Sequence, residues 1–311
     1  MVRPAAFAFN PETAASNAFQ SAAPEPGRPL SAGGSETQDQ ALREFDALAD
    51  ALRRAGIEVI VAADTASPPK PDAVFPNNWV SFHADGTVVL YPMMAPNRRL
   101  ERREDLIHQS IVQGGYRVTR TVDLSHREAQ GQFLEGTGSL VLDRVHRVAY
   151  ASLSPRTDLD VLGEFAQLLD YELVTFEACD ARARPVYHTN VVMAIGSGFA
   201  VFCGAAVGDA EHRAAVAAKL TATGHRLIDL SADQMLRFAG NILELAAPSG
   251  ALIVVSSGAW TSYEPGQRRI LEAQGSVLTA DIPVIERVGG GGVRCMLAEI
   301  HLPAAATAAA A

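Results

Sequence analysis

The residues best suited to chemistry in this chain lie near its end, where four glycines lead into a cysteine. Gly289 to Gly292 are followed by Val293, Arg294 and Cys295, and then by an apolar run typical of a buried strand. Glycine lets the backbone approach a ligand closely, and a cysteine at such a junction can face a cavity from a rigid element. This placement suits a nucleophile, because thiolate is the reactive form of cysteine. It also suits an inert buried thiol, since free cysteine behaves as a small hydrophobe.

Polar residues stand at regular intervals before pairs of apolar, strand-like segments along the rest of the chain. The landmarks are Asn78, Glu135, His188, Asn241 and Cys295, separated by 57, 53, 53 and 54 residues. Helical patterns lie between them at about 98–113, 158–170, 208–222 and 264–274. Near-constant spacing of similar units indicates a repeat architecture, in which each unit is a polar residue, a hairpin, a helix and another strand.

The N-terminal part supplies what a fifth unit requires. Ser35 and Gln38 have the spacing of a capping box, and the helix that they begin should run to Arg54, with Gly56 ending it. A strand at 57–63 follows. Five units closed on themselves would direct the landmark residues to a common axis, so we expect these residues to lie close together. Turn chemistry explains asparagine before a strand, but it does not explain His188 or Glu135. No helix is predicted to begin at Glu135, so a role in helix capping does not explain it either.

Composition excludes several classes of protein. The chain has 311 residues, of which 48% are hydrophobic, so it can bury a large core in one or two domains. The formal net charge is −9 and no basic stripe is present, which argues against a nucleic-acid partner. No apolar stretch reaches the roughly 18 residues of a membrane span, and the N-terminus lacks the pattern of a signal peptide.

The cysteines indicate the compartment. Cys179, Cys203 and Cys295 are widely spaced, so they predict neither a disulfide framework nor a metal site. We therefore expect a cytoplasmic protein with reduced thiols, no metal and no membrane association. The other histidines, among them His83 and His146, have no recognisable partner pattern.

Taken together, these segments resemble the pentein superfamily, the five-bladed α/β propellers of guanidine-modifying enzymes. The resemblance covers essentially the whole chain and is closest to the citrulline-hydrolase (ureidase), arginine deiminase-related branch. The segments that carry it are MVRPAAFAFNPETAASNAFQ, FPNNWVSFHADGTVVLYPM, FLEGTGSLVLD, YHTNV, FAGNILEL and GGGVRCMLAEI. It implies pseudo-fivefold ββαβ repeats around a central channel, in one catalytic domain over residues 1–303. An Ala-rich disordered tail is expected at 304–311. The oligomeric state is left open, with a homo-oligomer as one possibility.

The resemblance also implies roles for individual residues. It makes Cys295 the nucleophile, His188 the general acid and base, and Glu135 the group that bonds a substrate nitrogen and supports the histidine. Asn78 and Asn190 stand where deiminases carry carboxylates.

Further residues are expected to line the substrate site. Phe75 would form part of the channel wall, and Asn241 is either a substrate ligand or a turn residue. Asn10 and Asn17 are candidates for binding the amino-acid end of a substrate, although polar loop positions would have the same composition. The loop at 21–36 is either a surface linker or a mobile flap.

The reaction class needs a thiolate that attacks the sp² carbon of a guanidinium or ureido group, followed by loss of an amine and hydrolysis by water. It requires no cofactor. Asparagine at both deiminase carboxylate positions favours a neutral ureido group, because an unpaired buried cation is costly. We therefore expect hydrolysis of citrulline to ornithine, carbon dioxide and ammonia. An arginine dihydrolase, a deiminase and an amidinotransferase are alternatives, and a non-catalytic binding protein has no need of the Cys-His-Glu trio.

Overall fold

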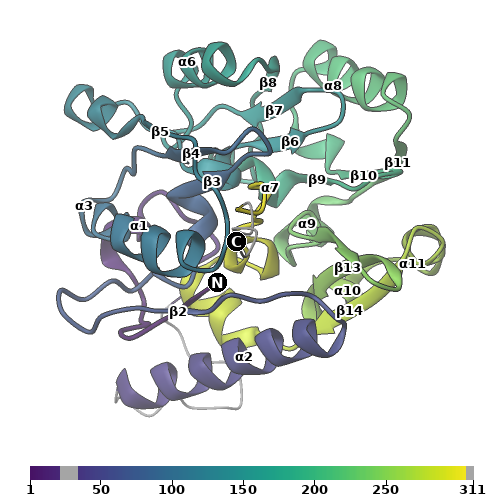
Figure 1. The fold of residues 1–311 in the computed structure, drawn as a ribbon. Helices are drawn as coiled ribbons and strands as arrows, with labels where there is room; N and C mark the ends of the chain where they lie inside the picture. Colours follow the sequence, from purple (N-terminus) through teal and green to yellow (C-terminus); the bar gives the residue numbers. More distant parts are fainter. Residues whose placement is uncertain (22–33, 306–311) are drawn as a thin grey trace, which may run out of the picture.

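The computed structural model describes residues 1–21 and 34–305, so most of the predicted 21–36 loop and of the tail at 304–311 lies outside the described residues. Within this part the strands form four three-stranded sheets and one two-stranded sheet, arranged around the middle of the molecule (Figure 1). This confirms the mixed α/β class. None of the described helices is long and apolar enough to cross a membrane.

All four three-stranded sheets have the same topology. The first two strands form an antiparallel hairpin and the third lies parallel to the second. A parallel neighbour needs a crossover connection, and helical segments supply it each time. The strands are β3 (Val80–Phe82), β4 (Thr87–Leu90), β5 (Arg120–Asp123), β6 (Val141–Asp143), β7 (Val148–Ser152), β8 (Glu172–Phe176), β9 (Met193–Ile195), β10 (Phe199–Phe202), β11 (Arg226–Asp229), β12 (Leu243–Ala247), β13 (Gly250–Ser256) and β14 (Ser276–Ala280).

Local sequence explains three of the crossover helices. Asp158 and Asp209 cap α6 (Leu159–Leu169) and α8 (Ala210–Ala222), each accepting hydrogen bonds from two backbone N–H groups of the first turn. Helix α11 (Pro265–Glu272) begins with a proline, which is favourable at the first helical position. These helices agree with the predictions at 158–170, 208–222 and 264–274.

The fourth crossover differs from the prediction of one helix at about 98–113. It consists of α3 (Pro96–Arg99), α4 (Glu104–Ile107) and a π-helical turn (His108–Val112). Arg103 has an extended backbone, with φ −116° and ψ 92°, so the helix stops before it and restarts after it. The Arg98 guanidinium pairs with Glu101 within this segment, whereas that of Arg102 pairs with Glu128 and ties the segment to the 3₁₀ turn Ser125–Gln130.

The N-terminal unit is only partly as predicted. Helix α2 (Gly34–Arg54) ends where expected, before Gly56 at φ +83°. The capping box expected at Ser35 and Gln38 falls in part on Ser35, whose side chain lies outside the described residues. The Gln38 side chain accepts from the backbone N–H of Phe7 and donates to the carbonyl oxygen of Pro4. The strand expected at 57–63 is reduced to β2 (Ala62–Ala63), which pairs in parallel with β1 (Val2–Arg3).

Short helical turns precede most of the hairpins, contrary to the prediction that the landmarks lead directly into strands. Glu135 is the N-cap of α5 (Gly136–Ser139) and His188 is the N-cap of α7 (Thr189–Val192), so the prediction that no helix begins at Glu135 is wrong. Cys295 lies in a 3₁₀ turn, Val293–Met296, and no strand is described after it. The Arg294 guanidinium donates to the Leu297 carbonyl oxygen there, which occupies an acceptor that a strand would need.

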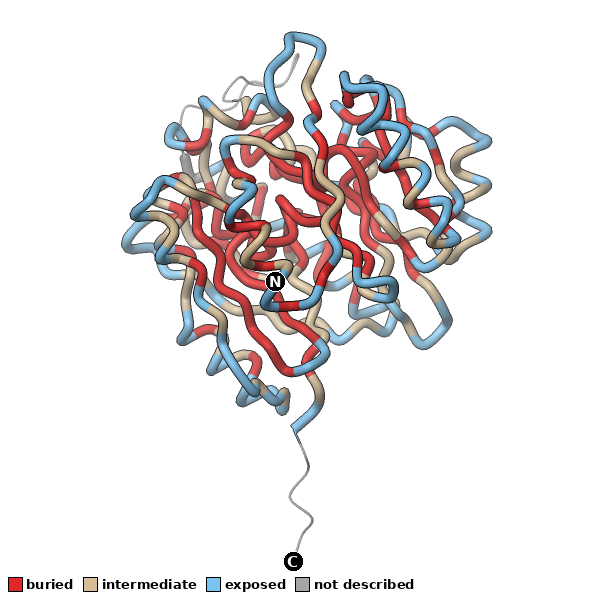
Figure 2. Tube along the Cα trace, turned by 90° about the horizontal axis from the view of Figure 1, so that it is seen from above, coloured by how far each residue is buried: buried red, intermediate tan, exposed pale blue. Residues whose placement is uncertain are grey.

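The remaining segments are short. They are α1 (Pro11–Ala14), α9 (Ala232–Leu236), α10 (Ser257–Ser262), the 3₁₀ turns Pro76–Asn78, Ser125–Gln130 and Gly204–Ala206, and the π-helical turn Ile285–Gly289. Buried residues fill the interior, whereas the outer faces of the helices are exposed (Figure 2). All residues of α5 and α7 are buried, so the polar residues next to them lie inside the protein.

Candidate active site

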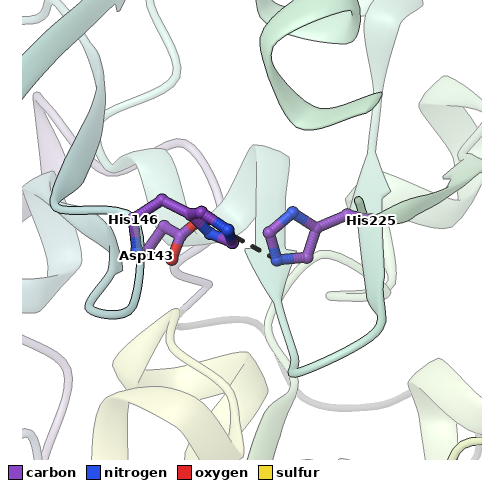
Figure 3. A group of neighbouring side chains, drawn as sticks. All are labelled: Asp143, His146 and His225. Atoms are coloured by element: carbon purple, nitrogen blue, oxygen red, sulfur yellow. Dashed lines mark hydrogen bonds and ion pairs between the residues drawn. The ribbon is translucent and has the colours of Figure 1, made fainter. Parts of the chain in front are cut away.

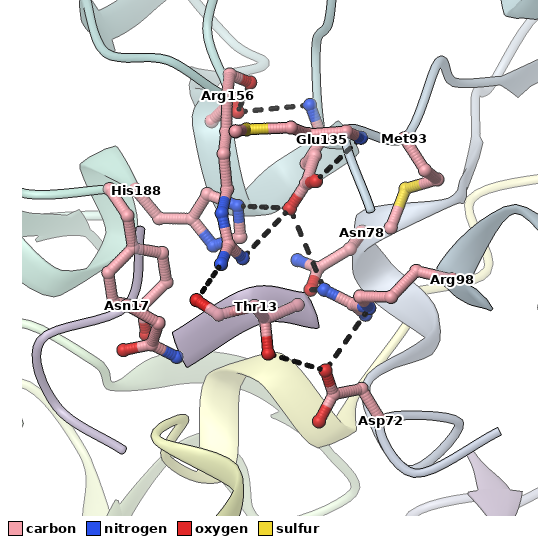
Figure 4. Close-up of polar contacts among 12 residues, drawn as sticks. Thr13, Asn17, Asp72, Asn78, Met93, Arg98, Glu135, Arg156 and His188 are labelled. Carbon is pink, nitrogen blue, oxygen red and sulfur yellow. Dashed lines mark hydrogen bonds and ion pairs between the residues drawn. The ribbon is translucent and has the colours of Figure 1, made fainter. Parts of the chain in front are cut away.

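Glu135 occupies the centre of a buried polar cluster (Figure 4). Its Oε2 lies 2.9 Å from His188 Nε2 and 3.3 Å from Arg156 Nη1, and Arg98 Nη1 is 3.6 Å away. Its other oxygen accepts a hydrogen bond from the backbone of Met94. Burial alone would raise the pKa of this carboxyl group, but Arg156, His188 and Arg98 hold the pKa well below its usual range. Glu135 is therefore an ionised carboxylate that already has several partners.

The turn after Glu135 requires glycine. Gly136 has φ +47°, and a Cβ there would lie 2.2 Å from the carbonyl oxygen of Asn77. This close approach packs α5 directly against the 3₁₀ turn that carries Asn78. The glycines of the Glu-Gly-Thr-Gly segment thus bring two landmark residues from separate units together.

His188 is held as a neutral base. Because a carboxylate can only accept, the Nε2 that faces Glu135 must carry the proton, which leaves the lone pair on Nδ1. This Nδ1 is buried and has no hydrogen-bond partner in residues 1–21 and 34–305. Burial lowers the pKa of His188 to about 4, although Glu135 acts in the opposite direction. The imidazole is therefore neutral at neutral pH, with its lone pair on Nδ1.

Cys295 lies in a shell of amide groups. Its Sγ is 3.3 Å from Asn241 Nδ2 and 3.4 Å from Asn190 Nδ2, and the residue is 2% exposed. Burial raises the pKa of the thiol, and these two amide donors work against the rise. Asn241 also accepts a hydrogen bond from the backbone N–H of Arg294, which fixes the turn that carries the cysteine.

The thiol and the His188–Glu135 pair are connected through Asn190. The Asn190 Nδ2 donates to the carbonyl oxygen of Thr137 in α5 and to the sulfur of Cys295. Asn190 itself belongs to α7, two residues after His188. Among the contacts of the described residues there is no direct hydrogen bond between Cys295 and His188. Asn190 therefore bonds the sulfur to α5, the helical turn that Glu135 begins, and the three predicted catalytic residues lie on adjoining buried turns.

The glycine run before Cys295 is packed tightly against aromatic and amide side chains. A Cβ on Gly289 would lie 2.8 Å from the ring of Phe75, and one on Gly292 would lie 2.7 Å from Asn241 Oδ1. Asn17 Nδ2 donates to the carbonyl oxygens of Gly289 and Gly290. Phe75 and Asn17 therefore both pack against the glycine run, and Asn17 uses its amide to hold this loop. Their expected roles in the channel wall and in binding the amino-acid end of a substrate stay predictions.

Asn10 and Asn78 contact charged residues. Asn78 accepts a hydrogen bond from Arg98 Nη1 at 3.0 Å, and Asn10 donates to Asp72 Oδ2 at 2.7 Å. Asp72 Oδ1 is buried and has no partner within the described part of the chain. Burial raises the pKa of Asp72, even though Arg98 and Asn10 oppose the rise.

Three charged residues of this cluster were not predicted: Arg98, Arg156 and Asp72. Each is no more than 2% exposed. Arg156 additionally donates to Ser16 Oγ and to the carbonyl oxygen of Thr13, which fastens the N-terminal segment over the cluster. An isolated arginine or aspartate in a sequence is usually an exposed residue, so the sequence carried no signal for these positions.

Comparisons with known proteins give a consistent result. A family model described as N,N dimethylarginine dimethylhydrolase, eukaryotic, matches residues 3–302. No curated protein matches the chain by sequence. The substrate-bound N-terminal domain of ArgZ, an arginine dihydrolase from the ornithine-ammonia cycle in cyanobacteria, is 19% identical with a TM-score of 0.68, over 97% of this chain and 98% of that domain.

Two other solved structures are similar. Unliganded AgrE is 18% identical with a TM-score of 0.69, over 99% of this chain and 40% of that one. A dimethylarginine dimethylaminohydrolase adduct is 15% identical with a TM-score of 0.60, over 87% of this chain and 92% of that one. The chain spans only 39% of full-length ArgZ. At these identities the likeness establishes the fold.

Proposed function

The chain belongs to the family of eukaryotic-type N,N-dimethylarginine dimethylhydrolases, within the pentein superfamily, and from this premise we propose that it is a cysteine-dependent hydrolase of C–N bonds in a ureido or guanidino amino acid. The observation that carries the proposal is the neutral His188, whose proton is held by Glu135 and whose Nδ1 is free to act as a base. A thiol held by two amide donors lies on an adjoining turn, where Asn190 bonds both the sulfur and α5.

The proposed reaction follows from these groups. The Cys295 thiolate attacks the sp² carbon of the substrate, and the C–N electron pair leaves with nitrogen, which takes a proton as it departs. His188 accepts the thiol proton and supplies one to the leaving nitrogen. Water then attacks the S-carbamoyl adduct while His188 takes its proton, and the C–S bond breaks to restore the thiol. The carbamic acid that is released loses carbon dioxide, which breaks the second C–N bond and gives the second amine. The Asn190 and Asn241 amides stabilise the sulfur anion by donating hydrogen bonds.

We propose citrulline as the substrate, with ornithine, carbon dioxide and ammonia as products. The support is that the polar side chains in contact with the sulfur are amides and that Glu135 is already paired with two arginines. A neutral ureido group needs no carboxylate partner, whereas an unpaired guanidinium would lose its hydration.

An arginine dihydrolase is the second candidate, and two observations favour it. The neighbours ArgZ and AgrE were solved with arginine-related ligands, namely substrate, L-arginine and ornithine. In this chain, the unpaired Asp72 Oδ1 could neutralise a cationic group of the substrate. Asp72 could instead bind the α-ammonium group of the substrate, with Arg98 and Arg156 binding its α-carboxylate. That arrangement would serve arginine and citrulline equally.

The architecture belongs to the same proposal. We infer that the five sheets are the blades of a propeller around a central channel, and that residues 1–303 form one catalytic domain. The repeated hairpin-plus-parallel-strand topology supports this, as does the placement of Asn78, Glu135, His188, Asn241 and Cys295 in one interior network.

Product analysis tests the function. The chain would be incubated with citrulline, arginine, agmatine and methylated arginines, and products would be identified by mass spectrometry alongside ammonia release. Citrulline should give ornithine and ammonia, and the Cys295→Ser variant should give neither. Rapid conversion of arginine that stops at citrulline would reject the citrulline reaction.

Two controls separate the remaining alternatives. Product formation that requires an added acceptor amine would identify an amidinotransferase. Absence of turnover with every substrate, together with failure of a haloacetamidine to label Cys295, would indicate a binding protein instead.

A further inference from the structure

Three side chains with metal-binding atoms converge outside the candidate active site. Asp143 ends β6, His146 lies in the turn between β6 and β7, and His225 directly precedes β11 (Figure 3). One ligand atom from each lies within 4.8 Å of the others. We propose that these residues bind a divalent transition-metal ion such as Zn²⁺, which would link two neighbouring sheets.

The carboxylate of Asp143 is already oriented for this purpose. Its Oδ1 accepts hydrogen bonds from the backbone N–H groups of Val145 and His146, at 3.1 and 2.9 Å, so the turn holds the side chain in place. Its Oδ2 faces both imidazoles, 2.8 Å from His146 Nδ1 and 3.9 Å from His225 Nε2. Asp143 is buried, and one oxygen is therefore directed to a single point between the two histidines.

His225 presents a bare nitrogen to the same point. The Thr223 hydroxyl lies within hydrogen-bond distance of the carbonyl oxygens of Lys219 and Leu220, and when it donates to one of them, the 2.9 Å contact with His225 Nδ1 has the imidazole N–H as its donor. Nε2 then carries a lone pair, and no hydrogen bond from the described residues satisfies it. In that tautomer the lone pair points toward the Asp143 carboxylate oxygen 3.9 Å away, an arrangement that a cation between them would stabilise. The hydroxyl of Thr223 acts as the outer partner that metal-binding histidines usually have.

The donor set selects the kind of ion. Two imidazoles and one carboxylate suit Zn²⁺ and other first-row transition ions, whereas Ca²⁺ and Mg²⁺ prefer sets made of oxygen. Because His146 Nδ1 now donates to Asp143, coordination through that nitrogen would require the ring proton to lie on Nε2. The site borders a cavity of about 240 Å³ that Glu244, Glu299 and Arg294 also line, which leaves room for solvent ligands.

A purely structural role would explain only part of the cluster. Capping of the turn by Asp143, with His146 beside it, needs no third residue. His225 comes from another sheet, is 6% exposed, and still aims at the same oxygen. The metal proposal accounts for all three residues.

Metal binding to the full chain tests the proposal. Chelator-treated protein would be titrated with Co²⁺ and Zn²⁺ by calorimetry and by absorption spectroscopy. We expect one equivalent to bind, with cobalt d–d bands but no thiolate charge-transfer band, and with a higher unfolding temperature. Cys295→Ser should bind equally well, since the site contains no sulfur, so the result is independent of the proposed hydrolysis.

Variants locate the ion. Asp143→Asn keeps the oxygen that caps the turn, and His146→Gln changes a side chain that is 42% exposed, so both should fold. These two and His225→Gln should weaken binding by more than the roughly 10- to 100-fold that loss of an outer-shell partner costs. His212→Gln, an exposed histidine of α8, should bind as the wild type does. Unchanged affinity in Asp143→Asn and His146→Gln, or a thiolate charge-transfer band, would overturn the proposal.

Discussion

His188 Nε2 lies 2.9 Å from Glu135 Oε2, and this contact determines which nitrogen of the imidazole can do chemistry. The carboxylate keeps the proton on Nε2, while two arginines keep the carboxylate ionised. Burial keeps the ring neutral. The proton-accepting atom is therefore Nδ1, which lies against Gly138.

Gly138→Ala should displace the imidazole. A Cβ at this position would lie 2.6 Å from His188 Nδ1 and 2.5 Å from Asn78 Nδ2, closer than atoms can approach. We expect activity to fall by about 100-fold or more, the size of a lost general-base contribution, with about 1–3 kcal/mol lost in unfolding free energy from overpacking.

Gly163→Ala is the matched control, because no atom lies within 4 Å of the Cβ that it would add to α6. It should stabilise the protein by up to about 1 kcal/mol and leave turnover unchanged. Steady-state kinetics and urea unfolding measure both effects. Wild-type activity in Gly138→Ala would contradict the assignment of Nδ1.

Asn241→Asp should raise the pKa of Cys295. The substitution keeps the oxygen that accepts from Arg294 but removes the donor at 3.3 Å from the sulfur. Loss of that donor disfavours the thiolate, so alkylation by a neutral haloacetamide should shift to higher pH in a Cys179→Ser background. Asn97→Asp, whose amide bonds Asn10, should leave the alkylation profile unchanged. An identical profile in Asn241→Asp would show that the amide does not stabilise the sulfur anion.

Asn78→Asp should change the preference between substrates. The new carboxylate would still accept from Arg98 and would add a negative charge beside Glu135 and Asp72. Because a guanidinium gains more from that charge than a ureido group does, kcat/KM for arginine relative to citrulline should rise about tenfold, or roughly 1.4 kcal/mol. Asn77→Asp places the same charge one residue away and should have a smaller effect. An unchanged ratio in Asn78→Asp would mean that charge does not set the preference.

His83 should make stability depend on pH. It is buried, bonds Ser81, and its pKa is lowered to about 3 by burial and by Arg144. Between the unfolded value of about 6.5 and this folded pKa, the unfolded chain binds a proton that the folded protein does not. The free energy of unfolding should therefore fall as pH falls through this range, by up to about 1.4 kcal/mol per pH unit from this residue.

Urea unfolding at pH 7, 6, 5 and 4 measures this dependence. His83→Gln should have a flatter profile than the wild type, whatever its stability at pH 7, while the exposed His212→Gln should follow the wild-type slope. Equal slopes for His83→Gln and the wild type would mean that His83 is protonated in the folded protein.

Much of the fold could be predicted because its determinants are local. Helical patterns predicted α6 and α8, each of which the structure shows to begin at a capping aspartate, and turn residues separate the strands of each hairpin. The regular spacing of Glu135 and His188 anticipated a contact that the structure contains. Caps and turns depend on neighbours within one or two turns, which a sequence displays directly, whereas the contact between Glu135 and His188 was inferred from the repeat.

Other features were decided only by packing. Arg98, Arg156 and Asp72 belong to segments that predict exposed residues, and they are buried because several sheets and the N-terminal turn enclose them around Glu135. His225 likewise meets Asp143 only because two sheets lie side by side. A charged side chain that is buried away from water must be paired, because an unpaired buried charge is costly. Which charged residues are buried depends on contacts between residues far apart in the chain.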